Sequence, residues 1–142
     1  MKKLAIALLL VVSSCRRQGA GGESMGAPSA RAAVDQFMAA AKAKDLDAMG
    51  RIWGTSQGPT ISTMPATERE RREVSIMPCL KHDRFVVLND TPATGGKRQF
   101  SVELRYKEVV AAAPFVAVMG PGGRWYVESV EVNDLRQICV AR

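Results

Sequence analysis

Residues 34–53 read VDQFMAAAKAKDLDAMGRIW, and this stretch decides the class of the fold. Apolar residues recur in its first half at positions i, i+3, i+4 and i+7, namely Val34, Phe37, Met38 and Ala41. Residues at this spacing share one face of an α-helix, so the pattern predicts an amphipathic helix that buries this face. A second, shorter apolar face follows, made of Leu46, Met49, Ile52 and Trp53.

Cap residues delimit the two helices predicted here. Ser29 is a favourable N-cap for a helix that begins at Ala30. Asp45 is a favourable N-cap for the second helix, and Gly54 ends it. The sequence therefore predicts a helix pair at the start of the folded region.

A third helix is predicted further along the chain, after a short strand over residues 60–63. Thr67 and Glu70 have the spacing of a capping box, in which each side chain accepts a hydrogen bond from a backbone amide. The apolar side of this helix consists of Val74, Met77 and Leu80. Pro78 ends or kinks the helix because its ring cannot be accommodated in a regular helix.

From residue 84 onward the apolar pattern changes from the helical period to alternation. Residues 99–107, QFSVELRYK, form the clearest strand, with every second side chain apolar. Three more strands are expected, over residues 85–89, 114–119 and 124–132. A change of phase in the last one predicts a β-bulge near Glu128 and Ser129. Helices followed by an antiparallel meander indicate an α+β fold.

Three of these features together resemble the NTF2-like superfamily: the run at 34–53 with its Lys-Asp-Leu junction, the long alternating strand, and the bent last strand with RWYV at 124–127. The resemblance implies one α+β domain over residues 29–142, with N-terminal helices packed on a curved antiparallel sheet of about four strands. It also implies a cone-shaped cavity between helix and sheet. A cystatin-like arrangement is the alternative, and the predicted third helix argues against it.

The expected cavity lining consists of the inward side chains Phe100, Val102, Leu104, Tyr106, Phe115, Trp125 and Val127. Enzymes of the superfamily place acid–base residues in the cavity, whereas Tyr106 is the one polar-tipped member of this set. We therefore expect a binding domain without enzymatic activity, which takes a small apolar ligand or a protein partner. A dimerising structural module and a cavity enzyme with a polar cluster around Tyr106 are the alternatives.

No catalytic, cofactor-binding or metal-binding residues are assigned from the sequence. It contains no P-loop, G-x-G-x-x-G, H-E-x-x-H or C-x-x-C motif. His82-Asp83 is interpreted as a turn-forming pair, because adjacent side chains on an extended chain point apart. The arginines around the third helix are interpreted as a solvated face paired with Glu68, Glu70 and Glu73.

The first residues have the layout of an export signal. Lys2 and Lys3 precede an apolar run over residues 4–12, which is too short to span a bilayer as a helix. Val12-Ser13-Ser14-Cys15 resembles the lipobox of bacterial lipoproteins. The resemblance implies a signal peptide over residues 1–14 and a diacylglyceryl group on Cys15, the lipid anchor to the membrane.

Residues 15–28 are rich in Gly, Ala and Ser and are expected to form a flexible tether. Arg16, rather than Asp, follows the cysteine, which favours the outer over the inner membrane of the cell envelope. The formal net charge is +6, but without Lys2 and Lys3 the balance is 18 basic against 14 acidic residues. This mild charge on an exported chain argues against nucleic acid as a partner.

Two cysteines remain after Cys15 is assigned to lipid. Cys79 and Cys139 form an even count in an oxidising compartment, which favours a disulfide between them. Two separate buried thiols are the alternative. A catalytic thiol is disfavoured, since His82 is the only histidine and nothing else indicates a catalytic dyad.

Overall fold

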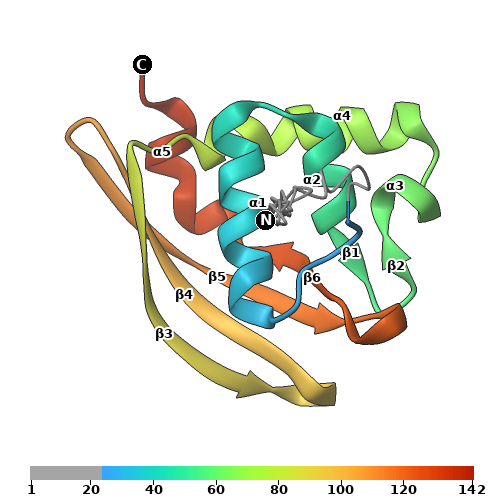
Figure 1. Cartoon of the computed structure of the whole chain (residues 1–142). Coiled ribbons are helices and arrows are strands. Elements are labelled where there is room, and N and C mark those ends of the chain that lie inside the picture. The colour runs from blue at the N-terminus through green and yellow to red at the C-terminus, as the bar shows by residue number, and fades with distance from the viewer. Residues whose placement is uncertain (1–23) are drawn as a thin grey trace, which may run out of the picture.

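The computed structural model describes residues 24–142 (Figure 1). The predicted signal peptide, Cys15 and most of the predicted tether lie outside the described residues. The helices are α1 (Ala30–Ala43), α2 (Leu46–Ile52), α3 (Thr60–Thr63), α4 (Ala66–Ile76) and α5 (Arg136–Val140). The strands are β1 (Gly54–Thr55), β2 (Gly58–Pro59), β3 (Arg84–Ala93), β4 (Lys97–Tyr106), β5 (Val109–Met119) and β6 (Trp125–Val130). Short 3₁₀ turns cover Met77–Leu80, Thr94–Gly96, Pro121–Gly123 and Val132–Leu135.

An antiparallel sheet in the order β3-β4-β5-β6 forms one layer, and α1 lies across its concave face (Figure 1). The sheet is open, and its arrangement with the helices confirms the predicted α+β class. Val116 pairs with Ser129 while Ala117 pairs with Val127, so Glu128 is an extra residue in β6. The predicted β-bulge is therefore confirmed, and such a bulge bends the strand that contains it.

The first helix forms as its caps and period predict. Ser29 Oγ accepts a hydrogen bond from the Ala32 amide at 3.1 Å, and Lys44 ends α1 in the left-handed conformation with φ 54°. The predicted face of α1 is buried against the sheet, where the Phe37 and Phe115 rings meet edge to face at 6.3 Å. Each fully buried side chain of this size contributes about 1.5–3 kcal/mol, so the packing of α1 on the sheet is a substantial source of stability.

The folded domain begins before residue 29, where the sequence places its boundary. The Ala27 and Trp125 backbones exchange two hydrogen bonds, of 2.8 and 2.9 Å, and Ala27 is fully buried. Gly26 has φ +67°, and a Cβ at this position would lie 2.8 Å from Cζ of Tyr126. Only glycine fits this approach without strain. Residues 26 and 27 are thus part of the fold, which corrects the predicted end of the flexible tether at residue 28.

The segment before and within α4 differs from the prediction. Residues 60–63 form helix α3 rather than a strand, because the Met64 amide closes a helical turn on the Thr60 carbonyl. Helix α4 begins after Pro65, so Thr67 lies inside the helix and the predicted capping box is wrong. Val74 is 59% exposed, and the side chains that α4 buries are Arg69 and Glu73. The predicted apolar face is therefore wrong at Val74.

The remaining differences concern element lengths. Strand β3 runs to Ala93, and a turn over Thr94–Gly96 joins it to β4. The strand is longer than predicted because the backbone pairing with β4 continues as far as Ala93 and Lys97. The predicted last strand ends at Val130, and the short helix α5, which the sequence did not predict, follows. Leu135 and Ile138 are fully buried and anchor this C-terminal segment in the core.

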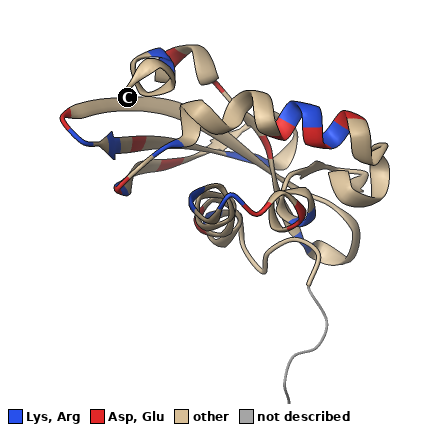
Figure 2. Cartoon of the chain, turned by 90° about the horizontal axis from the view of Figure 1, so that it is seen from above, with Lys and Arg blue, Asp and Glu red and all other residues tan. Residues whose placement is uncertain are grey.

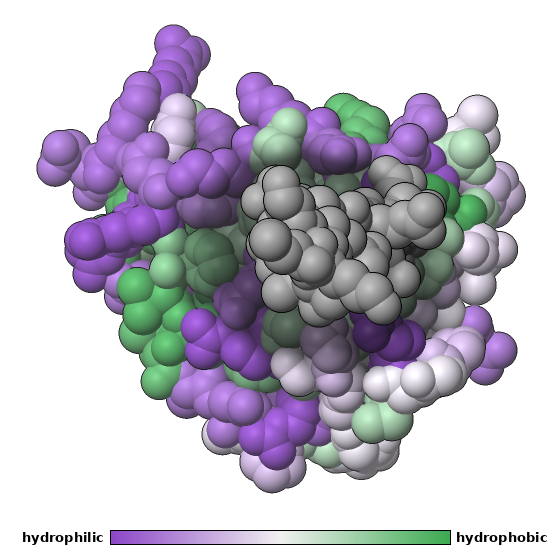
Figure 3. Space-filling model, viewed as in Figure 1, coloured by the Kyte–Doolittle hydropathy of each residue, from purple (hydrophilic) through white to green (hydrophobic). Residues whose placement is uncertain are grey.

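The surface is largely hydrophilic on the side seen in Figure 3, with a group of apolar atoms over β3 at the lower left. The exposed apolar side chains of β3 are Val86 and Leu88. Charges of both signs alternate along α4 (Figure 2). Within residues 24–142, no helix is long and apolar enough to cross a membrane.

Candidate functional site

The seven predicted cavity residues lie on the face of the sheet that α1 covers. Five of them are fully buried and belong to the core that packs α1 on the sheet: Phe100, Val102, Leu104, Phe115 and Val127. Tyr106 and Trp125 are half-buried and pack against this core from the ends of β4 and β6. The structure thus gathers these residues, but the five buried ones contact protein rather than open space.

An apolar hollow of about 220 Å³ opens beside the β-bulge of β6. Its walls combine Phe37 of α1, Trp53 after α2, Ile76 at the end of α4, and residues 128–130 and 132. The Trp53 indole Nε1 donates a hydrogen bond of 3.4 Å to the Glu128 carbonyl oxygen, inside the bulge. The bulge therefore both bends β6 and orients the aromatic wall of the hollow.

The walls of this hollow carry no uncompensated charge. Within residues 24–142, Glu128 is the one charged residue that lines it, and its Oε2 lies 2.6 Å from Nζ of Lys97. Apart from Glu128 and Ser129 the lining is aromatic or aliphatic. Such a site can bind a small apolar molecule by shape and burial of apolar surface.

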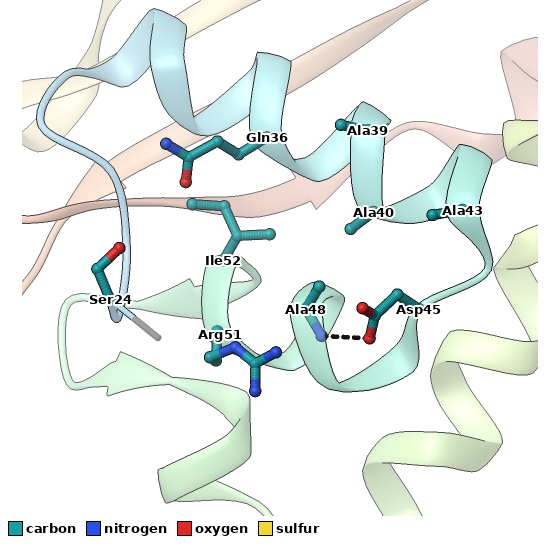
Figure 4. A pocket seen from close by; sticks show the side chains of 9 residues that line it. All are labelled: Ser24, Gln36, Ala39, Ala40, Ala43, Asp45, Ala48, Arg51 and Ile52. Carbon is teal, nitrogen blue, oxygen red and sulfur yellow. Dashed lines mark hydrogen bonds between the residues drawn. The ribbon is translucent and has the colours of Figure 1, made fainter. Parts of the chain in front are cut away.

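A second hollow, of about 350 Å³, lies between α1 and α2 (Figure 4). Four of its nine lining residues are alanines, at positions 39, 40, 43 and 48, and the others are Ser24, Gln36, Asp45, Arg51 and Ile52. Figure 4 shows Asp45 turned toward the start of α2, where its Oδ1 accepts a hydrogen bond of 2.9 Å from the Ala48 amide. The Asp45 carboxylate is therefore used as a helix cap, as the sequence predicts.

Arg69 and Glu73 form a buried ion pair within α4, and Arg69 also contacts the exposed Asp47 of α2; the burial of this pair was not predicted from the sequence. Arg69 Nη2 lies 3.1 Å from Asp47 Oδ1, and Arg69 Nε lies 3.7 Å from Glu73 Oε2. Glu73 is fully buried, and neither of its carboxylate oxygens has a hydrogen-bond partner in the part of the chain that the structure describes. Burial raises the pKa of Glu73 from 4.5 to about 7, although the charge of Arg69 acts in the opposite direction.

Arg69 and Glu73 pack against α2 at Gly50, which has no side chain. A Cβ at Gly50 would lie 2.9 Å from Cδ of Arg69 and 3.3 Å from Oε1 of Glu73. The i,i+4 spacing of Arg69 and Glu73 is visible in the sequence, but such pairs are usually solvated. Gly50 in the predicted second helix is the sequence feature that is consistent with a buried pair here, because it leaves room for the two side chains.

The predicted disulfide between Cys79 and Cys139 is confirmed. Cys79 lies in the 3₁₀ turn after α4, and Cys139 lies in α5. The bond thus connects the C-terminal helix to the middle of the chain. Cys15, the predicted lipid acceptor, lies outside the described residues.

His82 and Asp83 act separately, as expected for a turn-forming pair. His82 is buried with Nδ1 2.8 Å from the Leu80 carbonyl oxygen, and Asp83 Oδ2 accepts a hydrogen bond from the Lys107 amide. Among residues 24–142, no group of three or more His, Cys, Asp or Glu side chains could hold a metal ion.

No family model, curated protein or solved structure matches this chain.

Proposed function

We propose that this protein is an envelope-anchored binding domain that takes a small apolar ligand in the hollow beside the β-bulge. The hollow supports this function because its lining is almost entirely aromatic and aliphatic and includes the half-buried Trp53. Burial of apolar surface there is favourable by roughly 25 cal/mol per Å². The ligand site thus lies at the edge of the core, beside the face of the sheet where the NTF2-like resemblance places a cavity.

Binding is expected to be visible with N-phenyl-1-naphthylamine, a neutral apolar fluorophore. Its emission should rise on addition of the protein, and Val132→Phe should weaken its affinity about tenfold, because the larger side chain fills the hollow. The measurement is a fluorescence titration of the unchanged protein and of the variant.

The matched control is Val74→Phe, which makes the same change at an exposed position of α4. This variant should bind the probe like the unchanged protein. Equal affinities for all three proteins would show that the probe binds elsewhere, and would remove the proposed site.

The anchoring part of the proposal has its own test. In cells supplied with an alkyne fatty acid, the unchanged chain should incorporate label and Cys15→Ser should incorporate none, since the thiol is the lipid acceptor. A variant with serine at positions 79 and 139, which keeps Cys15, should still be labelled. Labelling of Cys15→Ser would contradict the assignment.

A further inference from the structure

We propose that a hollow at the C-terminal end of α1 binds a phosphate group. It measures about 240 Å³ and lies between the end of α1, the 3₁₀ turn Met77–Leu80 and the end of β4. Its polar lining consists of Lys42, Lys44, Lys81, His82 and Tyr106. This site is separate from the apolar hollow, and the proposal does not depend on the function proposed above.

Three lysines concentrate positive charge at this hollow. Among residues 24–142, the lysines Lys42, Lys44 and Lys81 form no ion pair with a carboxylate, whereas many other cations do. Cations that do form such pairs include Arg31, Arg69, Arg72, Lys97, Arg98 and Arg105. The carboxylate of Asp83, which follows His82 in the chain, accepts a hydrogen bond from the Lys107 backbone amide.

Two of the ammonium groups are held in place by neutral carbonyls. Lys42 Nζ donates to the Asp83 carbonyl oxygen at 2.8 Å, and Lys81 Nζ donates to the Ala141 carbonyl oxygen. A lysine ammonium has three donors, so each keeps two for a ligand. Their positive charges are therefore oriented before any ligand arrives, which lowers the entropic cost of binding.

His82 adds a further group that responds to an anion. The Leu80 carbonyl can only accept a hydrogen bond, so Nδ1 carries the proton and Nε2 is the second ring nitrogen. Burial lowers the pKa of His82 below 6.5 and the charge of Lys42 acts in the same direction, while the hydrogen bond to the Leu80 carbonyl and the charge of Asp83 act in the opposite direction. The groups around the ring are Lys42, Lys44, Lys81, Asp83, Phe85 and Tyr106. A bound anion would offset the lysines and favour the protonated ring.

The composition of the lining favours phosphate over a planar carboxylate. Arginine suits planar, bidentate recognition, whereas lysine binds phosphate as a point charge, and the cations here are lysines. Ala41, Met77 and Leu80 form apolar walls, which strengthen electrostatic attraction by excluding water. The volume corresponds to roughly eight waters at about 30 Å³ each, enough for a phosphate group with a small substituent.

The single histidine makes the test site-specific. The full chain is purified in a maltoside detergent, and the His82 ring signals are followed by NMR at fixed pH during titration with sodium phosphate. Sodium chloride at equal ionic strength is the reference. We expect a saturable shift of the His82 signals with phosphate alone, and about tenfold weaker affinity in Lys42→Gln and Lys81→Gln, since each loses a charged donor.

Arg71→Gln on α4 is the matched control, because it removes one charge from an exposed position outside the hollow. Soluble dihexanoyl phosphatidylglycerol, compared with its phosphatidylcholine analogue, distinguishes a lipid headgroup from free phosphate as the source. A shift with either phosphate source that Lys81→Gln weakens and Arg71→Gln preserves supports the site. No saturable shift with any of these probes, or equal weakening in all variants, would overturn it.

Discussion

Replacement of both Cys79 and Cys139 by serine is expected to lower the free energy of unfolding by about 4 kcal/mol, the value of the chain-entropy model for a loop of this length. The reason is that the disulfide links residues 60 positions apart and restricts the unfolded chain. Urea unfolding, followed by tryptophan fluorescence, measures the difference between the oxidised protein and the double variant.

The unchanged protein with its disulfide reduced is the control for the serine side chains themselves. It should unfold at the same urea concentration as the double variant. A loss below about 1 kcal/mol would show that the packing of Leu135 and Ile138 holds the C-terminal segment without the covalent bond.

Glu73→Gln is expected to change how stability depends on pH. The pKa of Glu73 is about 7 in the fold against 4.5 for the ordinary group, so the folded state binds the proton more tightly than the unfolded state. The unchanged protein must then lose stability as pH rises from 4.5 to 7, with no further loss above that range from this group. The full penalty is about 3 kcal/mol at 1.36 kcal/mol per pKa unit.

The variant lacks this titration, so its stability relative to the unchanged protein should rise by about 3 kcal/mol between pH 4.5 and pH 8. Arg69 keeps Asp47 as a partner in the variant, which limits the cost of the substitution itself. Urea unfolding at several pH values is the measurement. Glu68→Gln, at a half-exposed position of the same helix whose carboxylate pairs with Arg72 rather than Arg69, should follow the unchanged protein. Parallel profiles for Glu73→Gln and the unchanged protein would contradict the proposed titration.

Elements whose period is set by local side-chain order could be predicted from the sequence. The buried stripe of α1 and the alternation of β4 are visible because each places apolar residues on one face of a regular element. Even the bulge at Glu128 is visible as a change of phase. Each of these features depends on neighbours within one element.

Features that depend on distant elements could not be predicted. Helix α4 buries Glu73 and exposes Val74 because Gly50 of α2 leaves room for a charged pair, and the helical period alone assigns the apolar residue to the inside. Helix α5 is short, and its place depends on Leu135 and Ile138 reaching a core built by other elements.

The candidate site also combines features that are local to one element with features that depend on several elements. The residues of β4 and β5 expected to line a cavity are buried together on one face of the sheet, where Phe37 contacts Phe115. The hollow beside the bulge draws its walls from α1, the end of α2, α4 and β6. Trp53 and Val132 could be recognised as its lining only once these elements were placed in space.

The two hydrogen bonds between Ala27 and Trp125 also bear on self-association. Strand β6 is an edge of the sheet, and open backbone groups on an edge strand are a template for pairing with a second chain. Ala27 covers this edge at Trp125, and Trp53 covers it at Val127. A chain that began at residue 29 would expose the amide and carbonyl of Trp125 and would be more prone to aggregate through β6. The segment ahead of α1 thus covers part of the β6 edge and is expected to oppose pairing of β6 with a second copy of the chain.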